Sequence, residues 1–406
     1  MRKGWEIKKL SELFEVKSSS RVHQADWKTS GIPFYRAREV VKLAKDGFVN
    51  NELYISQELY NEFTKIKGAP KDGDIIVSAV GTLGQCYLVK KNDKFYFKDA
   101  SVLWLENHGE VNSRFIDFAF KSDLIINQVM EGSMGATVGT LTISRAKEIN
   151  VPIPSLSEQQ EIVSILDSAF ESIERVKSNT EQNLKNSIKL FDSYLKNIFE
   201  NKGENWEIKK LREVCVIING GTPDTSIPKF WDGENLWITP KDMGKLQSIF
   251  VDDTMRKITD EGLKNSSAKI LPTNSIILSS RAPIGHLAIN VKPISTNQGC
   301  KGLVPSNKLE YLFLYYFLYK SVDLLNSLGT GATFKELSGK KLSDVEIPIP
   351  PLDVQKVIIK KLKELSVKTK KLESKYQQKL NDLEELKKSI LQKAFNGELK
   401  TSKISA

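Results

Sequence analysis

Two long stretches of the chain place apolar or small residues at steps of three and four, the pattern of one helix face. The first runs from Ser157 to Asn201 and the second from Asp353 to Asn396, and neither contains proline or glycine. This pattern predicts two long helices, each with a seam that packs against another helix. The seam of the first helix is expected at Ile162, Leu166, Ala169, Ile173, Val176, Thr180, Leu184, Ile188, Phe191, Leu195 and Ile198. The seam of the second is expected at Ile358, Leu362, Leu365, Leu372, Tyr376, Leu380, Leu391 and Phe395.

Signals for the ends of these helices lie where helix-capping chemistry requires them. Ser157 and Asp353 follow proline-containing turns and are the expected N-capping residues. The glycines Gly203 and Gly397 are expected near the two C-terminal ends.

The chain also repeats itself. Trp5–Leu10 returns letter for letter as Trp206–Leu211, 201 positions later, and Pro152–Pro154 returns as Pro348–Pro350 at an offset of 196. The seams of the two helices match at 196 as well. A repeat of this size means two copies of a whole domain with its connector, not a solenoid. Two matched helices separated by a domain that returns the chain are most simply an antiparallel pair, although an oligomerisation coiled coil is the alternative.

Each half therefore has a globular part, expected at 1–150 and 205–346, and a helical part, expected at 151–204 and 347–406. The globular parts mix short apolar runs bounded by turn residues with helical patterns, which predicts α+β domains with a strongly bent sheet. The predicted strands are Asp74–Ser78, Ser275–Ser279, Phe95–Phe97 and Val102–Leu105. The most apolar run, Tyr311–Tyr319, has nine residues, whereas a membrane-spanning helix needs ~20. It predicts a buried helix.

Composition adds a basic balance and little chemistry. Lysine and arginine outnumber the acidic residues 60 to 50, for a net charge of +10, which favours a polyanionic partner. Three cysteines in no zinc or disulfide spacing, and no signal peptide at the start, indicate the cytoplasm. The chain has no P-loop and no clustered metal ligands, and its histidines, His23, His108 and His286, are isolated from one another. We therefore expect no catalysis, no metal and no cofactor on this chain.

Several segments, taken in order, resemble the DNA specificity subunit of type I restriction–modification systems. They are Gly220–Asp224, Phe230–Trp231, Leu236–Gly244, Ser279–Gly285, Ser295–Gly299, Gly331–Thr333 and Ile347–Leu352, with Gly135–Thr137 and Val151–Gln160 as first-half forms. The ordered set spans nearly the whole chain. The first half departs from the pattern, because Val16–Ser20 and Val80–Gly84 stand where the second half has Gly-Gly-Thr-Pro and Arg-Ala-Pro-Ile-Gly.

The resemblance implies two target-recognition domains, each reading one half of a bipartite site in double-stranded DNA, separated by two conserved helical regions. It implies that the helices set the gap and dock two methyltransferase subunits, which supply S-adenosylmethionine chemistry. A restriction and translocase subunit would join for cleavage, and no membrane would be involved.

Recognition is expected where the copies keep the scaffold and change the side chain. Arg281 stands for Val80 and His286 for Gln85 at offset 201, and Thr239 and Lys241 stand for Arg36 and Arg38 at offset 203. Arginine, glutamine and asparagine can read base edges. The DNA-binding candidates are Arg36, Arg38, Thr82, Gln85, Thr239, Lys241, Arg281, His286, Asn297, Gln298 and Lys301. For Arg281 the competing interpretation is a strand-end arginine paired with a carboxylate or solvated.

Two further features have open interpretations. The Gly-Ala-Thr loop, with Lys335 and Ser338 after it, could contact phosphate or form an ordinary helix cap. The lysine-rich face of the second helix could be solvated or could meet DNA or an acidic partner; it holds Lys356, Lys360, Lys361, Lys363, Lys368, Lys370, Lys371, Lys375 and Lys379.

Two other function classes stay open on the residues alone. One is a self-sufficient nuclease or methyltransferase with an unrecognised active site. The other is a coiled-coil adaptor without nucleic-acid binding.

Overall fold

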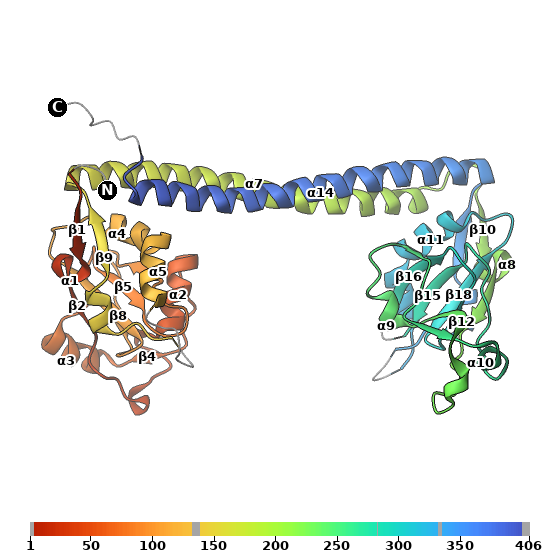
Figure 1. The fold of residues 1–406 in the computed structure, drawn as a ribbon, viewed down its shortest axis with the longest axis horizontal. Coiled ribbons are helices and arrows are strands. Elements are labelled where there is room, and N and C mark those ends of the chain that lie inside the picture. Colours follow the sequence, from red (N-terminus) through yellow and green to blue (C-terminus); the bar gives the residue numbers. More distant parts are fainter. Residues whose placement is uncertain (1–3, 132–138, 282, 332–334, 400–406) are drawn as a thin grey trace. The chain divides into compact units, whose positions relative to one another are not determined.

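The computed structural model describes residues 4–131, 139–281, 283–331 and 335–399. The chain divides into two compact units: unit 1 combines residues 1–181 and 378–406, and unit 2 is residues 182–377. Each unit holds one globular part and a segment of both long helices (Figure 1). No helix within the described ranges combines the length and the apolar character that a bilayer crossing requires.

Unit 1 contains short strands and helices in sequence order. They are β1 (Glu6–Lys9), α1 (Leu10–Leu13), β2 (Phe14–Lys17), η1 (Gln24–Asp26), β3 (Ile32–Tyr35), α2 (Ala37–Asp46), β4 (Tyr54–Ile55), α3 (Gln57–Lys67), β5 (Ile75–Ser78), β6 (Cys86–Leu88), β7 (Tyr96–Phe97), β8 (Val102–Asn107), α4 (Ser113–Phe120), α5 (Asp123–Glu131), α6 (Ile143–Lys147) and β9 (Asn150–Ile153). The strands form three sheets, in the orders β1-β9, β4-β3-β7 and β2-β8-β5-β6.

Unit 2 repeats this plan. Its elements are β10 (Glu207–Lys210), α8 (Leu211–Val214), β11 (Cys215–Asn219), η2 (Pro228–Phe230), β12 (Trp231–Ile238), α9 (Pro240–Met243), β13 (Phe250–Val251), β14 (Arg256–Ile258), α10 (Asp260–Lys264), β15 (Ile276–Ser280), β16 (Ile284–Asn290), β17 (Ile294–Thr296), β18 (Cys300–Pro305), α11 (Tyr311–Lys320), α12 (Val322–Leu328), α13 (Gly339–Ser343) and β19 (Glu346–Ile349). Its sheets have the orders β10-β19, β14-β12-β17 and β11-β18-β15-β16-β13.

The predicted strands and the α+β class are confirmed, and the strands of each unit are divided among three sheets. β5 and β15 are buried along their whole length at the centre of the largest sheet of each unit. Such a strand is buried on both faces and has no alternation of apolar and polar residues. The sequence pattern therefore does not show to which sheet each strand belongs. The apolar run that begins at Tyr311 forms α11, whose residues 312–318 are buried.

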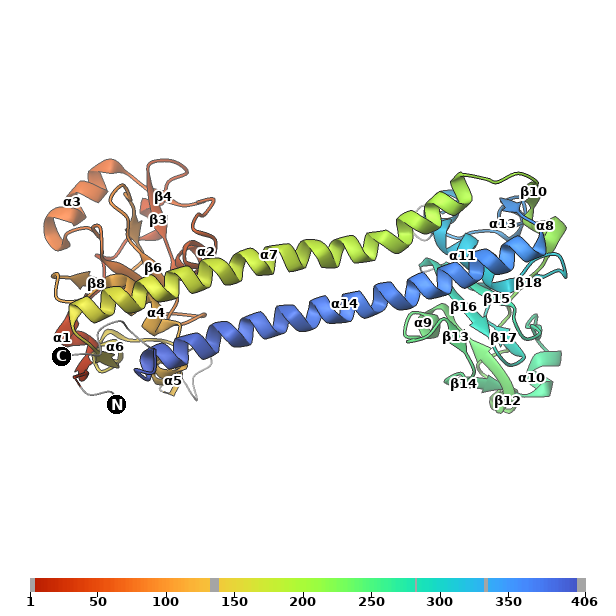
Figure 2. The same cartoon turned by 90° about the horizontal axis from the view of Figure 1, so that it is seen from above.

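The long helices are α7 (Leu156–Glu200) and α14 (Leu352–Phe395). In unit 1 Lys177 Nζ lies 2.6 Å from Glu384 Oε1, and Lys387 Nζ lies 2.9 Å from Glu174 Oε1. From the first ion pair to the second, the residue number falls by three on α7 and rises by three on α14. The two helices are therefore antiparallel, as predicted. Figures 1 and 2 show these segments side by side in unit 1.

Both helices begin earlier than expected, and the predicted caps Ser157 and Asp353 lie inside the first turn. At α7 the cap is Ser155, whose Oγ accepts the Glu158 amide at 3.3 Å. A glutamine in the first turn of each helix forms hydrogen bonds with the globular part of the unit in which that helix begins. Buried Gln355 accepts the Glu310 amide at 2.9 Å and donates to the Lys308 and Pro350 carbonyls at 3.0 and 2.9 Å. Gln159 makes the equivalent contacts with Asn112 and Pro154 in unit 1.

The seam prediction holds for most positions and fails at Ile188, which is 49% exposed, and at Leu372, which is 38% exposed. Ser187 and Thr369 are buried instead. Their hydroxyls donate to Leu184 and Ser366 carbonyls of their own helices, which removes the cost of burying them. The nine lysines predicted on one face of α14 are all exposed.

Candidate nucleic-acid interface

The loop that follows the central strand has the same construction in both units. In unit 2, Ser279 Oγ donates to the Pro283 carbonyl at 2.7 Å and accepts the His286 amide at 2.8 Å. In unit 1, Ser78 Oγ donates to the Thr82 carbonyl and accepts the Gln85 amide at 3.0 Å. His286 and Gln85 therefore occupy equivalent positions on one scaffold.

The residues aligned at the middle of this loop are also equivalent in space. Val80 forms a backbone bridge with Thr140, and Arg281 forms the corresponding bridge with Glu336. The loop thus exchanges an apolar side chain for a guanidinium while the backbone stays the same. Thr82 and Gln85 of unit 1 are exposed.

Arg281 lies across the turn that begins β18. A Cβ added to Gly299 would come within 3.0 Å of Pro240 Cγ and 3.2 Å of Arg281 Nε, so the glycine leaves room for the arginine side chain above this turn. Arg281 Nη1 is 3.9 Å from Glu336 Oε2, and the arginine side chain is 38% exposed. This is a long ion pair at the protein surface, which contributes little to stability.

Lys301 lies beside this arginine in the middle of the sheet. The residue is 7% exposed. Burial lowers its pKa, while Glu336 opposes that shift and Arg281 adds to it. Within the described part of the chain, no hydrogen bond or ion pair reaches its ammonium group. The side chain is thus largely buried while its ammonium group stays accessible, and desolvation of the charge disfavours the protonated form.

A tight contact between loops places Gln298 and Asn297 next to these cations. A Cβ on Gly220 would sit 1.9 Å from the Asn297 carbonyl oxygen, so only glycine fits there. The Gly221 amide donates to the Thr296 carbonyl at 2.8 Å, and Thr222 Oγ1 donates to Gln298 Oε1. Asn297 Oδ1 accepts the Gly299 amide at 2.9 Å. The Gly-Gly-Thr-Pro segment therefore braces the loop that carries Gln298 and Lys301.

The candidates after β12 and β3 lie at equivalent helix starts. Thr239 caps α9, and its Oγ1 donates to Asp242 Oδ2 at 2.7 Å, whereas Lys241 in the same turn is exposed. Half-buried His286 packs on this turn, with Nδ1 3.3 Å from the Pro240 carbonyl oxygen. Unit 2 thus brings residues 239–241, 281, 283–286 and 297–301 together.

In unit 1 the arginines at the matching turn are already paired. Arg36 Nη2 donates to Glu39 Oε1 at 2.9 Å, and Arg38 donates to Glu39 and Glu52. Burial pushes the pKa of Glu39 up, but hydrogen bonds from both arginines outweigh it and leave that pKa below its usual range. These contacts fit a structural role for Arg36, since Glu39 is buried and needs a cation.

The Gly-Ala-Thr loops lie largely outside the described residues, at 135–137 and 332–333. Ser338 is an ordinary helix cap, because its Oγ accepts the Lys341 amide at 3.2 Å.

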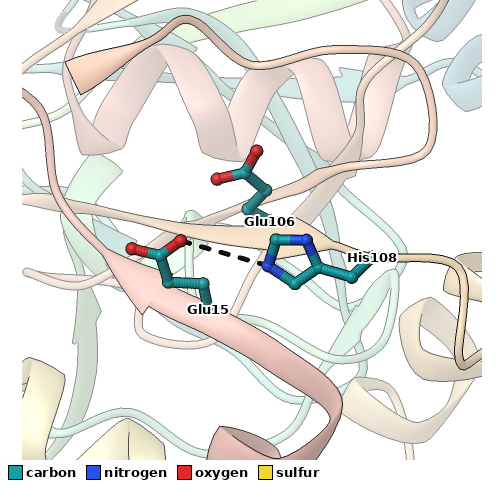
Figure 3. Close-up of side chains that lie close together, drawn as sticks. All are labelled: Glu15, Glu106 and His108. Carbon is teal, nitrogen blue, oxygen red and sulfur yellow. Dashed lines mark ion pairs between the residues drawn. The ribbon is translucent and has the colours of Figure 1, made fainter. Parts of the chain in front are cut away.

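One group in unit 1 has the composition of a metal site. Glu15, Glu106 and His108 lie with ligand atoms within 4.8 Å of one another (Figure 3). Glu106 is held by Lys17 and by Lys71, whose Nζ is 3.1 Å from Oε1. Two ammonium groups on the central carboxylate make this a surface ion-pair network.

Sequence reasoning passed over a stacked arginine in unit 2. The Cζ of exposed Arg256 lies 3.8 Å from the centre of the Trp231 ring and 5.1 Å from that of Trp237. At offset 203 Arg256 aligns with Leu53. The strand register supports this alignment, because the pair Ile32–Ile55 of unit 1 and the pair Asn235–Ile258 of unit 2 are also 203 positions apart. The same rule that selected Arg281 could have found this exchange.

The family model described as "Type I restriction modification DNA specificity domain" matches residues 2–186 and again 203–382. The chain belongs to this family. The "Type I restriction enzyme MjaIX specificity subunit" of Methanocaldococcus jannaschii is 39% identical over 158 residues, which span 38% of this chain and 36% of that relative. The "Putative type I restriction enzyme MjaX specificity subunit" of the same organism is 23% identical over 98% of this chain and 94% of its own length.

One chain of a solved structure has the same fold as this protein. That structure is described as "Structural basis underlying complex assembly and conformational transition of the type I R-M system". Its TM-score is 0.77 at 22% identity, over 98% of this chain and 99% of that one. Family membership confirms the expected resemblance and a role in DNA specificity, as a non-catalytic component of a restriction–modification system.

Proposed function

We propose that this specificity subunit reads a bipartite target in double-stranded DNA, with one half-site for each unit, and directs methyltransferase and restriction subunits to it in the cytoplasm. The observation that carries this proposal is the repeated loop with exchanged side chains. Val80 and Gln85 stand in unit 1 where Arg281 and His286 stand in unit 2, on the same hydrogen-bonded frame. A scaffold that is kept while its exposed groups change is what two readers of different sequences require.

In unit 2 the reading surface consists of Arg281, Gln298, Asn297 and Lys241, with Lys301 beneath. Arginine forms two hydrogen bonds to guanine O6 and N7, and amides do so to adenine. Lys301 and Lys241 supply charge for phosphates, which sets the position of the protein on the duplex. In unit 1 we assign reading to Thr82 and Gln85, because Arg36 and Arg38 are committed to carboxylates.

The methyltransferase subunits would bind the long helices and the globular parts beside them. A groove of about 700 Å³ in unit 2 is lined by residues of α7, α11, α14 and the segment 247–250; beside Asp192, Lys363, Lys370 and Glu373 it contains several apolar side chains. Of these, Ile188 is 49%, Phe250 38%, Tyr319 44% and Val367 68% exposed. An apolar surface of this kind on a chain of an assembling system fits the apolar face of a partner helix.

Unit 1 treats the equivalent positions differently. At offset 196, Ile188 and Phe191 correspond to Glu384 and Lys387, which form ion pairs with Lys177 and Glu174. In unit 1 the two helices are therefore joined at these positions by ion pairs. Packing of α7 against α14 does not by itself require the exposed apolar side chains of unit 2.

Sequencing of methylated bases in cells with and without this gene tests the proposal. The expected result is a two-part motif that disappears when the gene is deleted and returns with the intact gene. A motif that persists in the deletion strain, or methylation by the purified chain without partners, would refute it. If the protein bound no duplex DNA at any salt concentration, the result would favour the alternative of a coiled-coil adaptor without nucleic-acid binding.

A further inference from the structure

Arg256 differs from the other arginines of unit 2 in what it touches. Arg212 Nη1 donates to Asp344 Oδ1, and Arg281 lies 3.9 Å from Glu336. For Arg256, the described residues offer no carboxylate within ion-pair distance, and the guanidinium lies on tryptophan rings at 3.8 and 5.1 Å. An arginine held this way keeps all five of its donors for another molecule.

The rings that support Arg256 are themselves fixed. Trp237 is buried, and its Nε1 donates to the Gly221 carbonyl at 2.9 Å. Trp231 meets Trp237 edge-on at 5.1 Å, and its Nε1 donates to the Asp224 carbonyl at 3.2 Å. The platform therefore holds the guanidinium before any ligand arrives, which lowers the entropy cost of binding.

The backbone under Arg256 is held as well. The Trp237 amide donates to Thr254 Oγ1 at 3.2 Å, and that hydroxyl donates to the Arg256 carbonyl at 2.7 Å. Within the sheet, Arg256 faces Trp237 across the β12–β14 pair. A mobile loop arginine would lack these restraints.

The platform is continuous with the candidate reading surface. Gly221, which accepts the Trp237 bond, precedes Thr222, whose hydroxyl donates to Gln298. Gln298 in turn precedes the glycine on which Arg281 lies. One segment thus connects the arginine stack with the loop that carries Gln298 and Lys301.

The unit 1 counterpart removes this chemistry. Leu53 stands at the position of Arg256, and it packs partly buried against the core that contains Phe34 and Ile55. The strand pairing is kept, since the Phe34 amide donates to the Leu53 carbonyl at 2.9 Å. The position is another place where the two units keep the backbone and exchange the side chain.

We propose that Arg256 is a further specificity-determining residue, which reads a guanine through paired hydrogen bonds to O6 and N7 in the half-site of unit 2. The proposal rests on the proposed function. A stacked, planar fork with unpaired donors matches two acceptors in one plane. It also predicts that unit 1, with leucine at this position, has no equivalent contact.

The test uses the full chain assembled with its methyltransferase subunits and a pool of random duplexes, from which bound sequences are selected. The variants are Arg256→Lys, which keeps the charge and loses the planar fork, and Arg256→Gln. Arg212→Ala is the matched control, because that arginine is exposed and paired with Asp344. Melting temperatures of all variants establish that they are folded.

The expected result is that both Arg256 variants lose preference for one guanine by roughly 5- to 150-fold, in the same half of the motif that Arg281→Ala affects. The control should keep the wild-type motif. A uniform loss over all sequences with a shallower salt dependence would identify a phosphate contact and overturn the proposal, as would an unchanged motif or a change in the other half. Absence of any motif for the wild-type chain would instead overturn the proposed function itself.

Discussion

Replacement of Lys301 by methionine separates the stability of unit 2 from its function. Methionine keeps most of the length and apolar volume of lysine and removes only the ammonium group. Lys301 is 7% exposed, and burial lowers its pKa. The wild-type fold therefore bears part of the cost of desolvating a cation, and an anion next to the accessible ammonium group would relieve that cost.

The magnitude follows from that burial. Removal of a partly desolvated charge without a partner should stabilise unit 2 by at most ~1 kcal/mol at neutral pH, which corresponds to a rise in melting temperature of at most roughly 2–4 °C for a unit of this size. DNA binding should weaken evenly across sequences, and the slope of log affinity against log salt should fall by about 1.

The pH dependence has a definite sign. A lysine with a lowered pKa in the folded state is more readily protonated in the unfolded chain, so stability rises with pH between the folded pKa and the ordinary lysine value. Lys301→Met should remove that rise. DNA affinity of the wild type should fall as pH rises through the same window, because the ammonium group loses its charge.

Thermal unfolding from neutral to alkaline pH and DNA titration at several salt concentrations measure these effects. Lys308→Met is the control, because Lys308 is exposed and should change the melting temperature little. A Lys301→Met variant that is less stable than the wild type and binds DNA equally well would refute the reasoning, since Lys301 would then have a structural role.

Four further outcomes are expected. Arg281→Ala should cost ~1–3 kcal/mol of discrimination in one half-site only, measured as in the duplex selection; an equal loss on all sequences would make it a phosphate contact. Val367→Asp, at a side chain 68% exposed in the apolar groove, should reduce co-purification with methyltransferase subunits without lowering the melting temperature; unchanged co-purification would exclude the groove as their site. Gln355→Leu should destabilise the chain by ~1–3 kcal/mol, because it leaves the Glu310 amide without its acceptor; an unchanged denaturation midpoint would contradict this role. Insertion of four residues near Asn201 should lengthen the helix by ~6 Å and the gap of the methylated motif by about one or two base pairs; a changed half-site with an unchanged gap would contradict the spacer function of the helices.

The sequence by itself determined the elements whose signals are local and periodic. The three- and four-residue steps of α7 and α14, the repeat at 201 and 196, and the apolar runs of β5, β15 and α11 all predicted what the structure contains. Helix starts were less accurate, because the capping hydroxyl of Ser155 and the glutamine contacts of Gln355 depend on where the preceding turn lies.

Only the tertiary structure decided which candidate side chains are available. Arg36 and Arg281 are the same residue type at loop positions, yet one neutralises a buried glutamate and the other lies over a glycine at the surface. Lys301 is a charged residue in a strand, and its burial follows from neighbours on two adjacent strands. Arg256 stacks on tryptophans that lie 25 and 19 positions away in sequence. Pairing, burial and stacking depend on contacts between distant segments, and for that reason a single chain's pattern of residue types does not contain them.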